Sequence, residues 1–142
     1  MKRFRGKTID GGWVKGGLVP GSREDMYCIV TGAGAYAFVP VFAETVGQGT
    51  GLTDRSGREV FEGDIVETVR LGGISKSRFR SRVVIEAHGS APCLVARRLD
   101  AYADTPDGPQ PVFLRPEDLP AVLAAGVVIG NRHDNPELLK FW

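Results

Sequence analysis

Residues 50–66 read TGLTDRSGREVFEGDIV, and the order of turn-forming and apolar residues in this stretch predicts its local fold. Asp54, Ser56 and Gly57 supply the short polar side chains and the glycine that a tight turn needs after an extended run. A second turn is predicted at residues 62–64, and the β-branched residues after it favour another strand. We therefore expect a strand, a turn, a short strand, a second turn and a further strand.

Outside this stretch, short apolar runs separated by glycine and proline predict a mainly β protein. The chain has 19 glycines and 9 prolines, which favour many short strands joined by turns. The runs that we expect to form strands are residues 26–31, 35–42, 65–71, 76–86, 93–99 and 111–114. Helical signals come late: a proline-led turn at residues 116–119, a short helix at residues 120–125 that Gly126 ends, and a capped start at residues 135–137.

The predicted fold has two parts. An irregular N-terminal β region, about residues 1–62, leads into a small SH3-like barrel or strongly bent sheet, about residues 63–142, with short C-terminal helices. A chain of 142 residues is close to the usual size of one domain, so we treat residues 1–142 as a single unit with this internal subdivision. The likeness to SH3 barrels is a fold analogy and implies no function.

The composition is typical of a water-soluble globular protein, with 42% hydrophobic and 25% charged residues. The formal net charge is +1, so binding to nucleic acid or to an anionic surface would have to be local. No apolar run approaches the roughly 20 residues of a membrane span, and the basic N-terminus lacks the apolar stretch of a secretion signal. We expect a cytoplasmic protein without a membrane partner, in which Cys28 and Cys93 are reduced and buried.

Two stretches resemble the YopX family of phage and prophage proteins. Residues 50–66 are similar to the family's TGL-x-D-x-x-G-x-x-(I/V)-(F/Y)-EGDIV signature, and residues 129–139, IGNRHDNPELL, to its IGN-x-x-x-NPELL tail. Gly49 and residues 71–110 depart from the family pattern. Weaker similarity lies at residues 4–7, 12–16 and 44–48. The resemblance implies a phage or prophage origin in a bacterial host, a mainly β fold and no established activity.

The strongest chemical signal is a row of cations spaced by two. Side chains alternate faces along a strand, so these cations would share one face while Phe79 and Val83 lie on the other. The candidate binding residues are Lys76, Arg78, Arg80 and Arg82, with Arg97 and Arg98 on the returning strand. Such a surface suits phosphate backbones or an acidic protein. The alternative is a solvated strand face whose charges prevent edge-to-edge aggregation, and nearby aromatic residues are too few to support base stacking.

A second candidate surface is a polar cluster before the last helical turn, formed by Asn131, His133, Asp134 and Asn135. These side chains could line a binding surface. Alternatively, Asn135 caps the final helix while the apolar residues after it pack against the body of the protein or against another subunit.

Support for a catalytic or metal site is weaker. Glu59, Glu62 and Asp64 are close in sequence, and paired carboxylates can hold Mg²⁺ or do acid–base work. Asp54 and Asp64 can instead accept backbone N–H bonds in their turns. The histidines and cysteines lie at no metal-ligand spacing. We therefore expect no catalytic residue, no metal and no cofactor.

The leading hypothesis is a non-enzymatic accessory protein of a phage or prophage that binds a macromolecular partner and assembles as a homo-oligomer. Nucleic-acid binding through the basic hairpin is the alternative, and a metal-dependent hydrolase ranks third.

Overall fold

The structure is a computed structural model that describes residues 3–32, 37–72, 77–88 and 93–140. For residues 69–72, 77–80 and 101–102 it describes the backbone alone. The chain divides into two compact units, Met1–Gly51 and Leu52–Trp142. This boundary precedes the subdivision at residues 62–63 that we expect from the sequence, and that subdivision stays a prediction.

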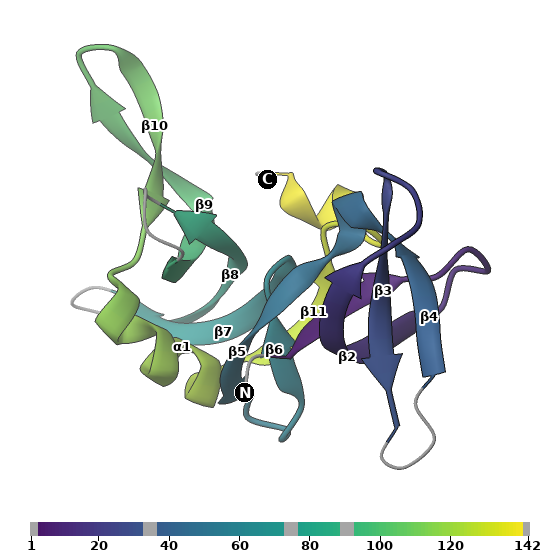
Figure 1. Cartoon of the computed structure of the whole chain (residues 1–142). Helices are drawn as coiled ribbons and strands as arrows, with labels where there is room; N and C mark the ends of the chain where they lie inside the picture. The colour runs from purple at the N-terminus through teal and green to yellow at the C-terminus, as the bar shows by residue number, and fades with distance from the viewer. Residues whose placement is uncertain (1–2, 33–36, 73–76, 89–92, 141–142) are drawn as a thin grey trace. The chain divides into compact units, whose positions relative to one another are not determined.

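Strands predominate in both units, which confirms the expected mainly β fold (Figure 1). The described strand pairings are antiparallel in each sheet. Within the described residues the only α-helix is α1 (Leu119–Ala125), and none of the helical segments there has the length and apolar content of a membrane span.

The Met1–Gly51 unit is a curled sheet. Its strands are β1 (Phe4–Lys7), β2 (Trp13–Pro20), β3 (Met26–Thr31), β4 (Ala37–Phe42) and β5 (Gly47–Thr53), with the 3-10 turn η1 (Ala43–Thr45) before β5. They neighbour one another in the order β4-β3-β2-β1-β5, and β5 continues past Gly51 into the second unit. The region is more regular than the sequence suggests.

An isolated bridge between Thr8 and Val41 brings the end of β1 back to β4, which gives this sheet its curl. Gly6 permits the approach, because a Cβ atom at that position would lie 2.6 Å from a methyl group of Val41. Ile29 and Val41 are fully buried inside the curl. The core of this unit is therefore small and lies on one face of β3 and β4.

The Leu52–Trp142 unit contains a five-stranded sheet in the order β10-β9-β8-β7-β11. Its elements are β6 (Glu59–Phe61), β7 (Asp64–Gly72), β8 (Ser77–His88), β9 (Cys93–Thr105), β10 (Gly108–Phe113), η2 (Pro116–Asp118), α1, β11 (Val127–Asn131) and η3 (Pro136–Leu139). Among the described strands this order is open, so the SH3-like barrel stays a prediction. The late helical segments at residues 116–125 and 136–139 confirm the sequence expectation.

Both faces of this sheet are covered near its centre. Val83, Val84 and Ile85 are all buried, although successive side chains of a strand point to opposite faces. One face packs in a cluster made of Val60, Val66, Val83, Ile85, Ala96, Leu119, Leu123 and Val128. The other face packs in a cluster made of Ile65, Val84 and Leu99, with Leu138 and Leu139 against it. Helix α1 therefore covers one face, and η3 covers the other.

The strand boundaries differ from the predictions where the chain turns tightly. Strand β9 runs to Thr105, past the predicted strand end at residue 99, and β10 begins at Gly108, so a short hairpin turn joins them (Figure 1). Gly108 has a φ of 105°, which favours glycine at this turn. Residues 35–36, the start of the strand expected at residues 35–42, lie outside the described residues.

Candidate functional site

The basic row lies on β8, and the extended backbone expected there is confirmed for residues 77–86. The register places Arg78 opposite Leu71, Arg80 opposite Val69 and Arg82 opposite Glu67. These arginine positions therefore share one face of the sheet. Lys76 lies outside the described residues.

The two arginines of the returning strand lie on different faces. Arg97 is opposite Val84, which puts it on the face of Arg82, whereas Arg98 is opposite Val83 on the face that α1 covers. The register thus brings Arg97 to the basic row and separates Arg98 from it.

Carboxylates accompany the arginines whose side chains are described. The Arg82 Nε atom lies 3.5 Å from Oε2 of Glu67, directly across the strands. Arg97 donates to both carboxylate oxygens of Glu86, at 2.9 and 2.8 Å. Glu86 also lies 3.7 Å from Arg132. These contacts reduce the local positive field that a phosphate backbone would meet.

Asp54 of the signature stretch is a buried turn residue. Its Oδ1 accepts hydrogen bonds from the Ser56 N–H and hydroxyl and from the Arg58 N–H, at 2.9, 2.7 and 3.0 Å. Its Oδ2 accepts the buried N–H of Val128 on β11 at 2.9 Å. Burial alone would raise the pKa of this carboxyl, but the hydrogen bonds outweigh burial and hold the pKa below its ordinary value. The side chain thus joins the first turn to β11.

Asp64 is the buried carboxylate of the second turn, as Asp54 is of the first. It is fully buried, and its Oδ2 accepts the Phe61 N–H at 2.8 Å. Gly63, with a φ of 92°, donates its N–H to the carbonyl of Ile85 and accepts the N–H of Arg132. Within the described residues, no group of three or more His, Cys, Asp or Glu side chains is arranged to hold a metal ion.

The polar cluster near the C-terminus forms its own turn. Oδ1 of the buried Asn131 accepts the N–H groups of His133 and Asp134, at 2.9 and 3.0 Å. Asn135 occupies the N-cap position of η3, but its side chain makes no capping bond and instead accepts the Asn131 N–H at 3.3 Å. The Asn135 side chain lies against Gly130, where a Cβ atom would be 2.5 Å from Oδ1 of Asn135. A binding role for the cluster stays a prediction.

The first feature that the sequence analysis missed is the outer apolar face of the Met1–Gly51 sheet. The register of β3 and β4 pairs Met26 with Phe42, Cys28 with Pro40 and Val30 with Phe38, so these side chains share the face opposite Ile29 and Val41. None of them is buried, and Phe38 is 63% exposed.

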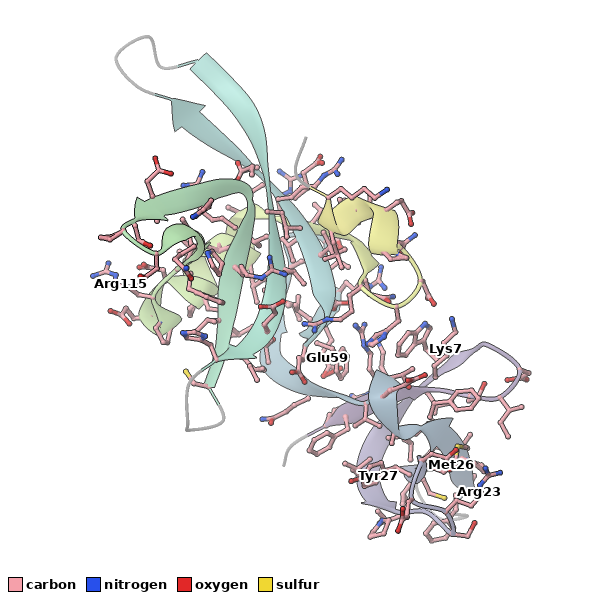
Figure 2. All side chains as sticks on the ribbon, turned by 90° about the horizontal axis from the view of Figure 1, so that it is seen from above. Lys7, Arg23, Met26, Tyr27, Glu59 and Arg115 are labelled. Carbon is pink, nitrogen blue, oxygen red and sulfur yellow. The ribbon has the colours of Figure 1, made fainter. Side chains whose placement is uncertain are left out.

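A pocket of about 390 Å³ opens on this outer apolar face, between Met26, Phe42 and the exposed Ile9, with Arg23 and Asp25 at its rim. Figure 2 labels Arg23 and Met26 at this place. Cys28 also lines the pocket; it and Cys93 are free but half-buried, less buried than expected.

The second missed feature is a groove of about 440 Å³ in the other unit, beside α1. Its lining comes from β7, β8, β9, η2 and α1 and from the residue after β10: Thr68, Ser81, Val83, Arg98, Leu114, Asp118, Ala121, Val122 and Ala125. Arg98 thus belongs to this groove and not to the basic row.

The sequence matches the family described as YopX protein over residues 22–140. The chain belongs to the YopX family. The match includes both strong signature stretches, residues 50–66 and 129–139, and confirms the resemblance, whereas the weaker similarities at residues 4–7 and 12–16 lie before it.

Among solved structures, the chain is similar to the crystal structure of protein EF1440 from Enterococcus faecalis. The two share 21% sequence identity, with a TM-score of 0.47 and 99% of each chain covered. No curated protein sequence matches the chain.

Proposed function

We propose that this YopX-family chain is a non-enzymatic accessory protein of a phage or prophage, and that it binds a partner protein through the outer apolar face. The observation that supports the proposal is the row of apolar side chains on β3 and β4, none of which is buried. Large contiguous apolar patches rimmed by polar residues mark interaction sites on soluble proteins. The charged Arg23 and Asp25 beside the pocket match the polar rim of a protein interface.

Phe38 would contribute transfer free energy to such a contact. A phenylalanine side chain buries about 200 Å². Covering the exposed 63% of Phe38 would remove about 125 Å² from water, which is worth about 3 kcal/mol at roughly 25 cal/mol per Å². The contribution to affinity is smaller than this transfer value, because association also costs translational, rotational and side-chain freedom.

The test compares how much partner protein is recovered with wild type and with variants at two exposed apolar residues. Full-length tagged protein is purified from bacterial cells that carry the gene, with and without nuclease treatment. Phe38→Asp should abolish recovery of the partner protein, and recovery from wild type should resist nuclease. Ile129→Asp is the matched control, since Ile129 is a 37% exposed apolar residue on β11 of the other unit. Equal recovery of every captured protein by wild type and Phe38→Asp contradicts the proposal.

Nucleic-acid binding is the second candidate function. The register of β8 and β9, which gathers Arg78, Arg80, Arg82 and Arg97 on one face, supports it. The carboxylates Glu67 and Glu86 on the same surface count against it. Anisotropy of a labelled oligonucleotide, measured over a range of salt concentrations, distinguishes the two candidates because phosphate binding weakens steeply with salt.

A cytoplasmic location in the bacterial host and assembly into a homo-oligomer belong to the same proposal. Size-exclusion chromatography with light scattering measures the oligomeric state directly. The proposed contact does not require the SH3-like barrel expected for residues 63–142, because the outer apolar face belongs to the Met1–Gly51 unit.

A further inference from the structure

The groove beside α1 has the size of a small-molecule site. Its volume of about 440 Å³ lies within the range of roughly 300–1,000 Å³ that is typical of ligand pockets. All of its lining residues belong to the Leu52–Trp142 unit, so its shape does not depend on the other unit.

One wall of the groove is apolar. Leu114 follows β10, and Val122 comes from α1; both are half-buried and pack against the core on this face of the sheet. Ala121 and Ala125 are four residues apart and therefore lie on one side of the helix, where their small side chains leave space above the sheet. Val83 on β8 forms part of the floor.

The lining of the groove also contains an oriented guanidinium group, that of Arg98. The Nε atom of Arg98 donates to Oδ1 of Asp100 at 3.3 Å, and the Ser81 hydroxyl donates to Oδ2 of the same carboxylate at 2.9 Å. Burial by itself raises the pKa of Asp100, but the bonds from Arg98 and Ser81 outweigh it and hold the pKa below its ordinary value. Asp100 therefore stays ionised and fixes the orientation of Arg98.

The terminal nitrogen atoms of Arg98 are its remaining donors. Among the residues that the structure describes, its Nη atoms make no hydrogen bond or ion pair. The other charged group of the lining, Asp118, accepts bonds from Arg115 at 3.0 and 3.3 Å. The planar pair of Nη donors matches the two oxygens of a carboxylate, and such charge-assisted pairs are stronger than neutral hydrogen bonds.

From this arrangement we propose that the groove binds a small amphipathic carboxylate, whose oxygens accept hydrogen bonds from the Nη atoms of Arg98 and whose hydrocarbon part packs against Leu114 and Val122. This site is separate from the outer apolar face and requires no protein partner.

Octanoate is the probe, and octan-1-ol is its uncharged counterpart. Titration of the purified full-length chain, followed by calorimetry and by amide chemical shifts, should show saturable octanoate binding with shifts in α1, β8 and β9. Octan-1-ol should bind at least tenfold more weakly, because its uncharged hydroxyl group cannot accept hydrogen bonds from both Nη atoms of Arg98 as a carboxylate does. Absence of saturable octanoate binding, or equal affinity for both probes, overturns the proposal.

Arg98→Gln and Arg97→Gln form a matched pair of variants. The two arginines are neighbours on β9, each is half-buried and ion-paired, and they point to opposite faces of the sheet. Octanoate affinity should fall at least tenfold in Arg98→Gln and remain unchanged in Arg97→Gln. Equal losses in both variants contradict the assignment of the carboxylate to Arg98.

A variant that fills the groove tests the site independently of Arg98, in case Arg98→Gln disturbs the fold. Ala121 is exposed on α1, so Ala121→Trp places a large ring in the groove without displacing a core residue. Octanoate binding should be lost while far-UV circular dichroism stays that of wild type. Retained binding in the folded Ala121→Trp protein places the ligand elsewhere and overturns the proposal.

Discussion

Replacement of Asp54 by alanine is the sharpest test of the turn that carries the family signature. The carboxylate accepts four hydrogen bonds, three from the turn and one from the Val128 N–H. Val128 is 6% exposed, so its N–H would be left buried without an acceptor, at a cost of about 2 kcal/mol. The three donors of the turn are exposed and can bond to water instead, so the loss of each of their hydrogen bonds to Asp54 costs roughly 0.5 kcal/mol. The expected total is about 3 to 4 kcal/mol, a large part of a typical stability of about 5–15 kcal/mol.

Urea unfolding followed by circular dichroism measures this loss, and hydrogen exchange at the Val128 amide locates it. Asp10→Ala is the control, since Asp10 is an exposed turn residue of the other unit that accepts a bond from the Thr8 hydroxyl. We expect the Asp54→Ala variant to unfold at lower urea and to exchange the Val128 amide much faster, while Asp10→Ala resembles wild type. Similar unfolding curves for both variants would refute the structural role of Asp54.

The pH dependence of stability provides a second measurement on the same residue. Because folding lowers the pKa of Asp54 below 3.8, the ionised carboxylate contributes stability that is fully present above pH 3.8 and is lost as the pH falls toward the folded-state pKa. Wild type should therefore lose more unfolding free energy than Asp54→Ala as the pH is lowered through this range. Parallel curves for the two proteins would show that Asp54 does not contribute.

Three further predictions concern packing and charge. Gly16→Ala should lower the unfolding free energy by about 1–3 kcal/mol or more, because the added Cβ atom would lie 2.1 Å from a backbone carbonyl of β3. Gly17→Ala is the control and should be tolerated, since no atom lies within 4 Å of the Cβ atom added there. Equal melting temperatures for the two variants would contradict the prediction. Leu123→Ala should cost about 2–5 kcal/mol in urea unfolding, since Leu123 is a fully buried residue of α1 that packs against the sheet, and a loss below 1 kcal/mol would mean that α1 is not packed on the sheet. If the basic row binds phosphate through four arginines, its affinity for an oligonucleotide should fall about 150-fold between 50 and 200 mM salt. In the double variant Arg78→Ser with Arg80→Ser, the fall over the same salt range should be only about 12-fold. A salt-independent affinity would exclude phosphate binding by the basic row.

The turns and some of the strands and helices could be predicted from the sequence, because they are determined by residues next to them in the chain. Asp54 and Gly57 define a turn within a few residues, and the predicted strand at residues 26–31 coincides with β3. The proline-led helix before Gly126 is also set by neighbouring residues. Each of these elements depends on turn chemistry or capping that the adjacent sequence contains.

The candidate site could not be predicted in the same way, because it depends on pairings between distant segments. In β4 the residues on both faces are apolar, so the sequence does not show that Val41 is buried while Phe38 is exposed. The neighbours Arg97 and Arg98 are separated only by the register of β8 and β9. The partner of Arg82, Glu67, lies on another strand. The groove likewise exists only once α1 packs beside the sheet.

The hydrogen bond from Val128 to Asp54 spans 74 residues, and this separation has a consequence for biosynthesis. At about 5–20 residues per second, the ribosome needs about 4–15 s after making the signature turn to add the strand that completes it. During that interval β7 lacks its neighbour β11, and its open edge is a template for misassociation with other nascent chains. Chaperones that shield emerging β-strands should therefore improve the yield of this protein more than chaperones that act after release.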